Sequence, residues 1–270
     1  MFGRRFVLLV ALLGATAWTA GCPMPHTFKG APVIVQEKVV DLSYSFGPDT
    51  IYWPTGESFA LQRTHFGRTP DGYWYASNNI CMAEHGGTHM DAPIHFGEGK
   101  NTADQVPLSD CIGPAAVIDV RDKVAADRDY RLSVEDIAAW EGQHGRLPKG
   151  AIVVMYSGWG TRWGNKLAYL GTDKAGDVAN LHFPGFSRQA AELLVAQREI
   201  AAIGVDTASI DHGPSHDFPV HRVINGANKP AFENVANVER LPPAGATLIA
   251  LPMKIAGGSG GPTRIIALLP

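Results

Sequence analysis

Cysteine is scarce in this sequence of 270 residues, which has only three, at positions 22, 81 and 111. So few cysteines do not define a disulfide framework, and we expect Cys81 and Cys111 to be free thiols. The fold must then depend on a hydrophobic core. The hydrophobic content of 45% and charged content of 18% are ordinary for a globular protein.

Runs of basic residues are also missing. Lys and Arg number 23 against 26 Asp and Glu, which gives a formal net charge of −3. A nucleic-acid-binding surface needs clustered positive charge, so no nucleic-acid partner is expected. Beyond the N-terminus, no apolar stretch approaches the length of a membrane span.

The first 21 residues have the pattern of an export signal. Arg4 and Arg5 precede a short apolar run over residues 6–13, and small residues follow. The segment 19–22, Thr-Ala-Gly-Cys, resembles a bacterial lipoprotein cleavage box, in which Cys22 would be lipidated. Because Thr19 stands where Leu is usual, simple cleavage is the alternative. We therefore expect an exported protein, either periplasmic or membrane-anchored, with a proline-containing linker over residues 22–38.

The remaining residues, 39–270, show no internal repeat and no domain boundary. Compact apolar runs predict strands over residues 33–42, 115–120, 151–156, 200–205, 246–251 and 264–269. Ser133, followed by Asp136, and Ser187 are N-cap candidates for two helices. Residues 43–80 indicate short strands and loops, with their aromatics mostly in the core. The sequence therefore predicts one α/β domain. Residues 158–184 lack periodicity, which favours a functional cover or an interface arm.

A stretch over residues 85–96 concentrates the candidate chemistry. His85, His89, Asp91 and His95 lie within eleven positions, and imidazole and carboxylate are ligands that zinc prefers. Gly86 and Gly87 favour a tight turn over a helix. In an extended segment His89 and Asp91 point the same way, so they can converge with His85 on one ion. His95 would be a fourth ligand or a base, and we favour the base because four protein ligands would close the site. The plainer interpretation is a polar surface loop.

The spacing His85-x3-His89-x-Asp91-x3-His95 resembles the signature of the cyclase-like metal-dependent hydrolases, a family that includes bacterial kynurenine formamidase and isatin hydrolase. Two further segments support the resemblance. One is Asp206-Thr-Ala-Ser-Ile-Asp211 followed by Phe218-Pro-Val-His-Arg222, and the other is Glu233-Asn-Val-Ala-Asn237. Together they extend the resemblance over most of the chain from Val39 onwards.

The resemblance implies a metal site and a fold. His85, His89 and Asp91 match the ligands of a first metal, and Asp91 would bridge to a second metal completed by His221 and Glu233. His95 matches the catalytic histidine. Two zinc ions are expected, with manganese as the alternative. The implied fold is a swivelling β/β/α arrangement with a mixed sheet, assembled as a homodimer.

The implied reaction is hydrolysis of an aryl formamide of the N-formylkynurenine type. Hydrolysis of isatin or of another cyclic amide or lactone by an exported enzyme is the alternative. A lipoprotein that binds a ligand through metal without turnover is a third reading, against which the presence of His95 argues.

Several other residues carry weaker expectations. Asp206 and Asp211 would orient ligand histidines, although a role at strand ends is equally plausible. Trp53 or Phe59 would form a wall of the pocket. His65 and His182 are candidates for the pocket lining, and His212 and His216 are expected in loops.

Overall fold

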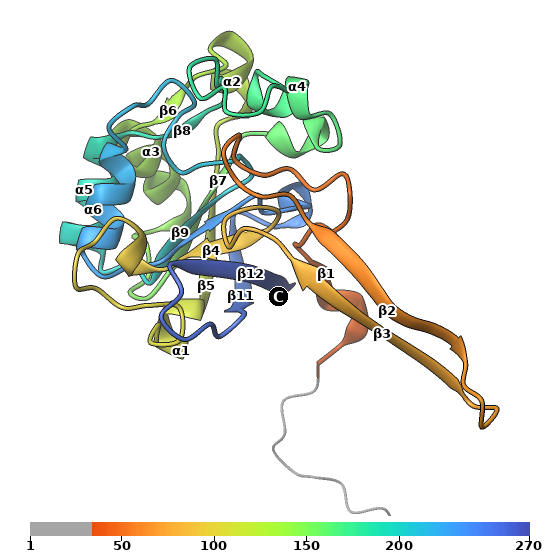
Figure 1. Cartoon of the computed structure of the whole chain (residues 1–270). Coiled ribbons are helices and arrows are strands. Elements are labelled where there is room, and N and C mark those ends of the chain that lie inside the picture. The colour runs from red at the N-terminus through yellow and green to blue at the C-terminus, as the bar shows by residue number, and fades with distance from the viewer. Residues whose placement is uncertain (1–33) are drawn as a thin grey trace, which may run out of the picture. The chain divides into compact units, whose positions relative to one another are not determined.

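The computed structural model describes residues 34–270, so the predicted export signal, Cys22 and most of the linker lie outside the described residues. One sheet dominates the described chain (Figure 1). Its strands are β1 (Val39–Asp41), β4 (His89–Asp91), β5 (Ile112–Asp119), β7 (Ile152–Tyr156), β9 (Ala202–Val205), β10 (Ala231–Glu233), β11 (Ala244–Pro252) and β12 (Gly260–Leu268).

The strands are ordered β1-β12-β11-β5-β7-β9-β10-β4, and β4 also pairs with β12. This second pairing closes the sheet from β12 round to β4 and leaves β1 outside the closure. Strands β5, β7, β9 and β10 are parallel, whereas β11, β12 and β4 pair antiparallel with their neighbours. The prediction of one α/β domain with a mixed sheet is confirmed, while the swivelling β/β/α arrangement stays a prediction.

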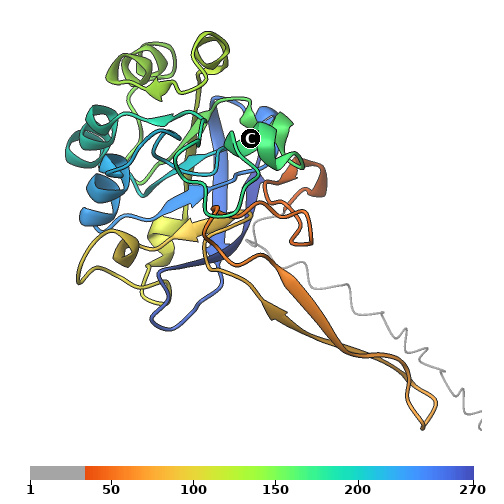
Figure 2. The same ribbon diagram turned by 45° about the horizontal axis from the view of Figure 1, so that its top comes forward.

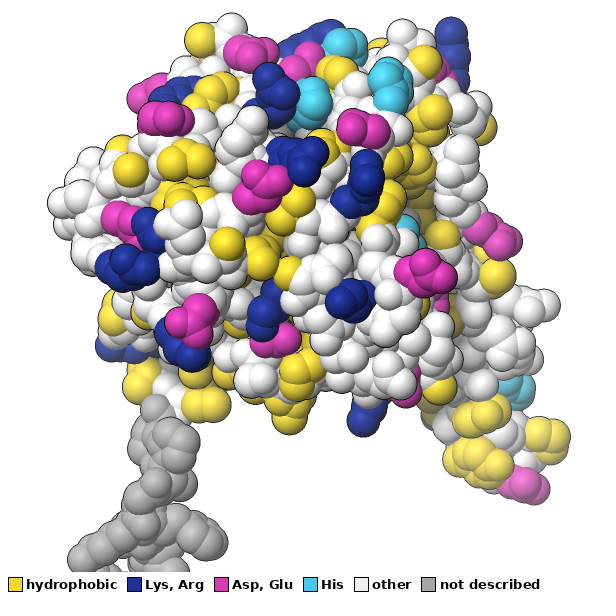
Figure 3. Space-filling view, turned by 90° about the vertical axis from the view of Figure 1, so that its left-hand side faces the viewer, with side chains coloured by type: hydrophobic (Ala, Val, Ile, Leu, Met, Phe, Trp, Pro, Cys, Tyr) yellow, Lys and Arg dark blue, Asp and Glu magenta, His cyan; other side chains and the backbone are white. Residues whose placement is uncertain are grey.

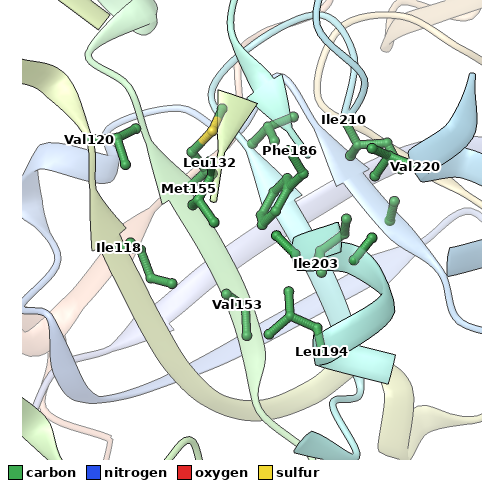
Figure 4. Close-up of a cluster of buried hydrophobic side chains, with 14 of the residues drawn as sticks. Ile118, Val120, Leu132, Val153, Met155, Phe186, Leu194, Ile203, Ile210 and Val220 are labelled. Carbon is green, nitrogen blue, oxygen red and sulfur yellow. The ribbon is translucent and has the colours of Figure 1, made fainter. Parts of the chain in front are cut away.

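Side chains of the central strands point alternately to the two faces of the sheet, and each face has its own hydrophobic core. Ala115, Val117, Ile152 and Val154 belong to a core shared with β11, β12 and β4. The alternate residues of the same strands, such as Ile118, Val153 and Met155, point the opposite way, towards the helices (Figure 4). Successive side chains of a strand alternate between faces, so each strand feeds both cores. Burial on both faces explains why these strands read as continuous apolar runs in the sequence.

The helices are α1 (Leu108–Cys111), α2 (Arg121–Ala126), α3 (Val134–His144), α4 (Lys166–Leu170), α5 (Arg188–Arg198) and α6 (Pro219–Gly226). Both predicted helix starts are confirmed. At α3 the Ser133 hydroxyl accepts from the Asp136 N–H, and the Asp136 carboxylate accepts from the Ser133 N–H. At α5 the Ser187 hydroxyl accepts from the Ala190 N–H. Within the described residues, no helix combines the length and apolar character needed to cross a membrane.

Residues 43–80 contain a feature that the sequence analysis did not foresee. Among the described residues, strands β2 (Ala60–Arg68) and β3 (Trp74–Cys81) pair only with each other, and they project from the body as a ribbon (Figures 1 and 2). Phe66, Trp74 and Tyr75 are exposed on it. The prediction of strands in this region is confirmed. The prediction that its aromatic residues pack in the core is wrong for these three.

Residues 158–184, expected to form a cover or an interface arm, pack against the core, and the cover or interface role stays a prediction. The segment contains a 3-10 turn (Trp159–Arg162) and α4. A short strand, β8 (Gly185–Phe186), follows the segment and pairs with β6 (Arg131–Leu132). Trp159, Tyr169 and Phe183 are buried in the core shared with the helices. The Trp159 indole N–H donates to the Tyr169 carbonyl at 2.7 Å. Buried aromatic side chains and this hydrogen bond hold the irregular backbone in place, which explains why the sequence here shows no helical periodicity.

Both cysteines in the described part of the chain are free, as predicted, but only Cys81 is exposed. Burial raises the pKa of the Cys111 thiol to about 11. The thiolate is the reactive form, so Cys111 should be inert at neutral pH. We expect iodoacetamide at pH 8 to alkylate Cys81 in the native protein and Cys111 only after unfolding, as read by peptide mass mapping. Equal labelling of both in the native state would contradict the buried position of Cys111.

Charged side chains are mixed on the face shown in Figure 3. Lys and Arg alternate with Asp and Glu there, without a continuous area of one sign. This face therefore offers no basic stripe of the kind that tracks a phosphate backbone.

Candidate metal centre

The strand that closes the sheet also carries two of the predicted ligands. In β4, His89 and Asp91 are two residues apart and point to the same side, as expected for an extended segment. The pairing sets Glu233 of β10 opposite His89 and Gly260 of β12 opposite Asp91. Closure of the sheet thus places side chains that are distant in sequence around one point.

The predicted turn at Gly86-Gly87 is confirmed. Gly87 has a φ of 57°, which glycine adopts without strain. A Cβ at Gly86 would lie 2.0 Å from Cδ1 of Tyr52, so the backbone packs directly on that ring. The turn brings the His85 and His89 rings to a centroid distance of 5.4 Å.

Four side chains form a tight cluster of nitrogen and oxygen atoms. His89 Nε2 lies 3.3 Å from Asp91 Oδ1 and 3.4 Å from Glu233 Oε2. His221 Nε2 lies 3.3 Å from Asp91 Oδ2 and 3.3 Å from Glu233 Oε1. Ligand atoms at roughly 2.0–2.1 Å from a tetrahedral ion are separated by about 3.3 Å, since the edge of a tetrahedron is about 1.6 times its radius. The cluster therefore fits a cation.

The hydrogen bonding of the cluster supports the same conclusion. All four residues are buried, yet His89 Nε2 and Asp91 Oδ2 have no hydrogen-bond partner within residues 34–270. Buried polar atoms are almost always satisfied, so such atoms call for a ligand. The metal-competent groupings are His85 with His89 and Asp91, and Asp91 with His221 and Glu233. Asp91 is common to both, as a bridging carboxylate requires.

Neighbouring groups orient the ligand side chains. His221 Nδ1 hydrogen-bonds to Asp211 Oδ2 at 2.7 Å, and His89 Nδ1 to the Gly87 carbonyl at 3.0 Å, which turns both Nε2 atoms inward. Glu233 Oε1 accepts from the Ile210 N–H at 2.9 Å. Partners of this kind fix the tautomer and direction of metal-binding imidazoles. Asp211 thus orients His221 as expected, while the role of His221 as a metal ligand stays a prediction.

Asp206 has a different role from the one first considered for it. Its carboxylate accepts hydrogen bonds from the backbone N–H groups of Ser157 and Trp159, at 3.1 and 3.0 Å. It thus anchors the turn after β7 and orients none of the ligand histidines within hydrogen-bond reach. Its position at the end of β9 agrees with the structural alternative.

Electrostatics at the cluster favour bound positive charge. Burial alone would raise the pKa of Asp91, but hydrogen bonds with His221, His85 and His89 hold it well below the usual range. Burial and the nearby charge of Asp91 raise the pKa of Glu233. Two carboxylates this close repel each other when both are ionised, and a divalent cation between them removes that cost.

A cavity of about 300 Å³ opens onto the cluster. His95 lines it at the end of a 3-10 turn (Pro93–His95), with its ring stacked on His85 at 3.9 Å between centroids. Aromatic rings line part of the same cavity. Phe218 lies 6.1 Å from Trp53 and 5.2 Å from Phe96 between ring centroids. The Phe96 and Phe218 rings also contact His221, at 4.7 and 5.8 Å between centroids, so the aromatic wall adjoins the polar cluster directly.

Trp53 was therefore correctly expected in the pocket wall, whereas Phe59 packs near Phe46 and does not line this cavity. Phe96 and Phe218 were missed. Their signal was proximity in sequence, because Phe96 directly follows His95 and Phe218 opens the segment that carries His221.

Four histidines considered from the sequence, His65, His182, His212 and His216, do not line the cavity. His65 sits on the projecting ribbon in β2, and His182 pairs with Asp129 at 2.7 Å, so neither lines the pocket as considered. His212 and His216 are in the loop before α6, as expected.

Comparisons with known proteins place the chain in one family. The family described as putative cyclase matches residues 40–212. The chain is 36% identical to isatin hydrolase from Roseibium aggregatum over 208 residues, covering 74% of this chain and 77% of that protein. It is 25% identical to kynurenine formamidase from Salinibacter ruber over 228 residues, covering 84% and 96%.

Solved structures give the same picture. Isatin hydrolase A from Ralstonia solanacearum superposes with a TM-score of 0.77 at 34% identity, covering 86% of this chain and 92% of that one. An isatin hydrolase bound to the product analogue thioisatinate superposes with a TM-score of 0.78 at 33% identity, covering 86% and 92%. The resemblance seen in the sequence is confirmed, and the chain belongs to the putative cyclase family.

Proposed function

We propose that this protein is a metal-dependent hydrolase that cleaves the amide bond of an acylated aryl nitrogen. The observation that carries the proposal is the buried cluster of His89, Asp91, His221 and Glu233 at the floor of an aromatic-walled cavity. A polar cluster that opens into an apolar pocket suits a ligand with a flat ring and one reactive carbonyl.

His85, His89 and Asp91 would hold one ion, and Asp91, His221 and Glu233 a second, with zinc as the proposed metal and manganese as the alternative. When bound, such ions polarise a carbonyl and lower the pKa of water. The ligand set of imidazoles and carboxylates suits both metals. Metal analysis of the purified protein tests the count, since one ion per chain would remove the second grouping.

His95 would handle the protons of the reaction. Burial lowers the pKa of His95 to about 3, so the ring is neutral near pH 7 and would hold a transferred proton only briefly. It would take the proton of the attacking water and pass it to the departing aryl nitrogen. Trp53, Phe96 and Phe218 would stack on the aromatic ring and hold the scissile bond over the cluster.

Two substrate types satisfy this chemistry. The first is an aryl formamide of the N-formylkynurenine type. The second is a cyclic amide of the isatin type, which is favoured by the higher identity to isatin hydrolase, 36% against 25% for the Salinibacter formamidase. Both present an aryl nitrogen acylated by a small group.

The test is turnover by the purified chain loaded with zinc or with manganese. N-formylkynurenine and isatin are offered in parallel, and we expect hydrolysis of at least one. Saturable binding without turnover of any aryl amide or lactone would instead support the non-catalytic metal-dependent binding protein.

We also propose a homodimer formed through the projecting ribbon of β2 and β3. A two-stranded ribbon is marginal alone in water, and this one exposes Phe66, Tyr73 and Trp74. A twofold dimer would bury the same ribbon of both copies. Light scattering should give twice the mass of the chain. Trp74→Ser should shift the protein towards monomer, whereas Leu167→Ser, at an equally exposed site on α4, should not. A monomeric wild type at micromolar concentration would contradict the dimer.

Export remains a proposal based on residues 1–22. We expect the mature chain to begin at residue 22, with a lipid on Cys22 if the lipoprotein interpretation holds. Mass spectrometry of the protein from membrane and periplasmic fractions distinguishes a lipidated from a simply cleaved chain, and an intact Met1 would contradict both.

A further inference from the structure

The glycine-rich segment between β11 and β12 reaches the metal cluster from the far end of the sequence. Ser259 Oγ lies 2.9 Å from His85 Nε2 and 2.6 Å from Glu84 Oε2. The neighbouring glycines permit this approach. A Cβ at Gly260 would lie 2.6 Å from His85 Cε1, and one at Gly258 would lie 2.8 Å from Glu84 Oε1. The segment is therefore shaped around Glu84 and His85.

Only one assignment of donors and acceptors satisfies all the hydrogen bonds between His85, Ser259 and Glu84. An ionised Glu84 carboxylate can only accept, and it receives both the N–H of Ser259 at 3.0 Å and its O–H at 2.6 Å. With its proton committed to Glu84, the Ser259 oxygen can only accept from His85. His85 Nε2 must then carry a proton and donate it to Ser259.

This direction determines which atom of His85 faces the cluster. Nδ1 lies 2.7 Å from Asp91 Oδ1, and with the proton on Nε2 both atoms offer lone pairs. Two acceptors at that distance need a cation between them. The distance is that of a hydrogen bond, and a metal ion that replaced the proton would separate the two atoms to about 3.3 Å. His89 and His221 differ, since their Nδ1 atoms are hydrogen-bonded and their Nε2 atoms point inward.

We propose that Glu84 and Ser259 are positioning residues that hold His85 in the Nε2–H tautomer, so that its Nδ1 atom binds the metal. The inference rests on the metal site of the proposed function. Under this proposal His85 binds metal through Nδ1, whereas His89 and His221 bind through Nε2. The segment between β11 and β12 fixes the orientation of His85. Such partners typically change metal affinity by roughly 10- to 100-fold.

Zinc affinity, measured by competition with a chromogenic chelator, tests the proposal without relying on turnover. We expect Ser259→Ala and Glu84→Ala to weaken zinc binding by roughly 10- to 100-fold. Glu84→Gln keeps an acceptor oxygen, and Ser259→Thr keeps the hydroxyl, so both should recover most of the affinity. The visible spectrum of the cobalt(II)-loaded protein should change in the two alanine variants and return in the conservative ones.

Asp104→Ala is the matched control. Asp104 accepts from the Gly257 N–H at 3.0 Å and so holds the same segment without touching His85. Equal loss of affinity in this control would assign the effect to loop stability and overturn the proposal, as would unchanged binding in Ser259→Ala. If wild-type protein binds neither zinc nor cobalt, the metal site of the proposed function fails as well. Zinc bound equally by wild type and variants overturns only the positioning role.

Discussion

Asp91→Asn is expected to abolish both metal binding and hydrolysis. Asp91 is the one residue common to both metal-competent groupings, so its change affects every ion that the cluster can hold. The amide is nearly isosteric with the carboxylate but lacks its charge, and a neutral oxygen is a poor bridge between cations. We expect zinc affinity to fall by more than about 100-fold, because losing a ligand should exceed the effect of losing a ligand's partner.

The expected loss in kcat/KM is about 1,000-fold or more, equivalent to roughly 4 kcal/mol of transition-state stabilisation. Metal analysis, chelator competition and turnover of an aryl amide are measured on the same preparation. Asp110→Asn is the control, since Asp110 is a buried carboxylate paired with Lys229 at 3.0 Å, away from the cluster. Full metal content with normal turnover in Asp91→Asn would rule out the bridging role.

The buried strands and capped helices were predictable because their signals are local. Residues 115–120 and 151–156 read as continuous apolar runs because both faces of these strands are covered. Ser133 and Asp136 predicted the start of α3 because a capping box needs only two residues three positions apart. The projecting ribbon gave no such signal, because a strand exposed on both faces needs no alternation of polar and apolar residues.

Closure of the sheet was not predictable for a different reason. The closing strand is three residues long and contains His89 and Asp91, which have no strong strand preference. Its register is set by partners on β10 and β12 that lie more than a hundred residues away. The formation of such a strand depends on its packing against distant segments, which a short stretch of sequence does not reveal.

The same distinction applies to the site. His85, His89, Asp91 and His95 were recognisable from spacing alone, because one turn and one short strand bring them together. His221 and Glu233 came only from the resemblance to a known family, since neither has a local signature. Ser259 contacts His85 across 174 positions, and a lone serine among glycines reads as a flexible linker. Contacts made by closure of the sheet appear only in three dimensions.

His95→Ala is expected to lower kcat by about 100- to 10,000-fold while leaving the metal content unchanged. The His95 ring lines the cavity and stacks on His85, where a proton can pass between water and a departing nitrogen. Because its pKa is lowered to about 3, protonation of His95 should not reduce kcat as the pH falls from 7 to 5. A residue that only packs would affect KM or stability before kcat.

Metal content in the same variant decides between the two roles that the sequence allowed for His95. A general base can be removed without loss of the ion, and added imidazole should then restore part of the activity. Phe96→Leu, the adjacent cavity residue, controls for disturbance of the pocket wall and should change mainly KM. If His95→Ala instead loses zinc in proportion to activity, His95 is a fourth ligand, and proton transfer must be assigned to another group in the cavity.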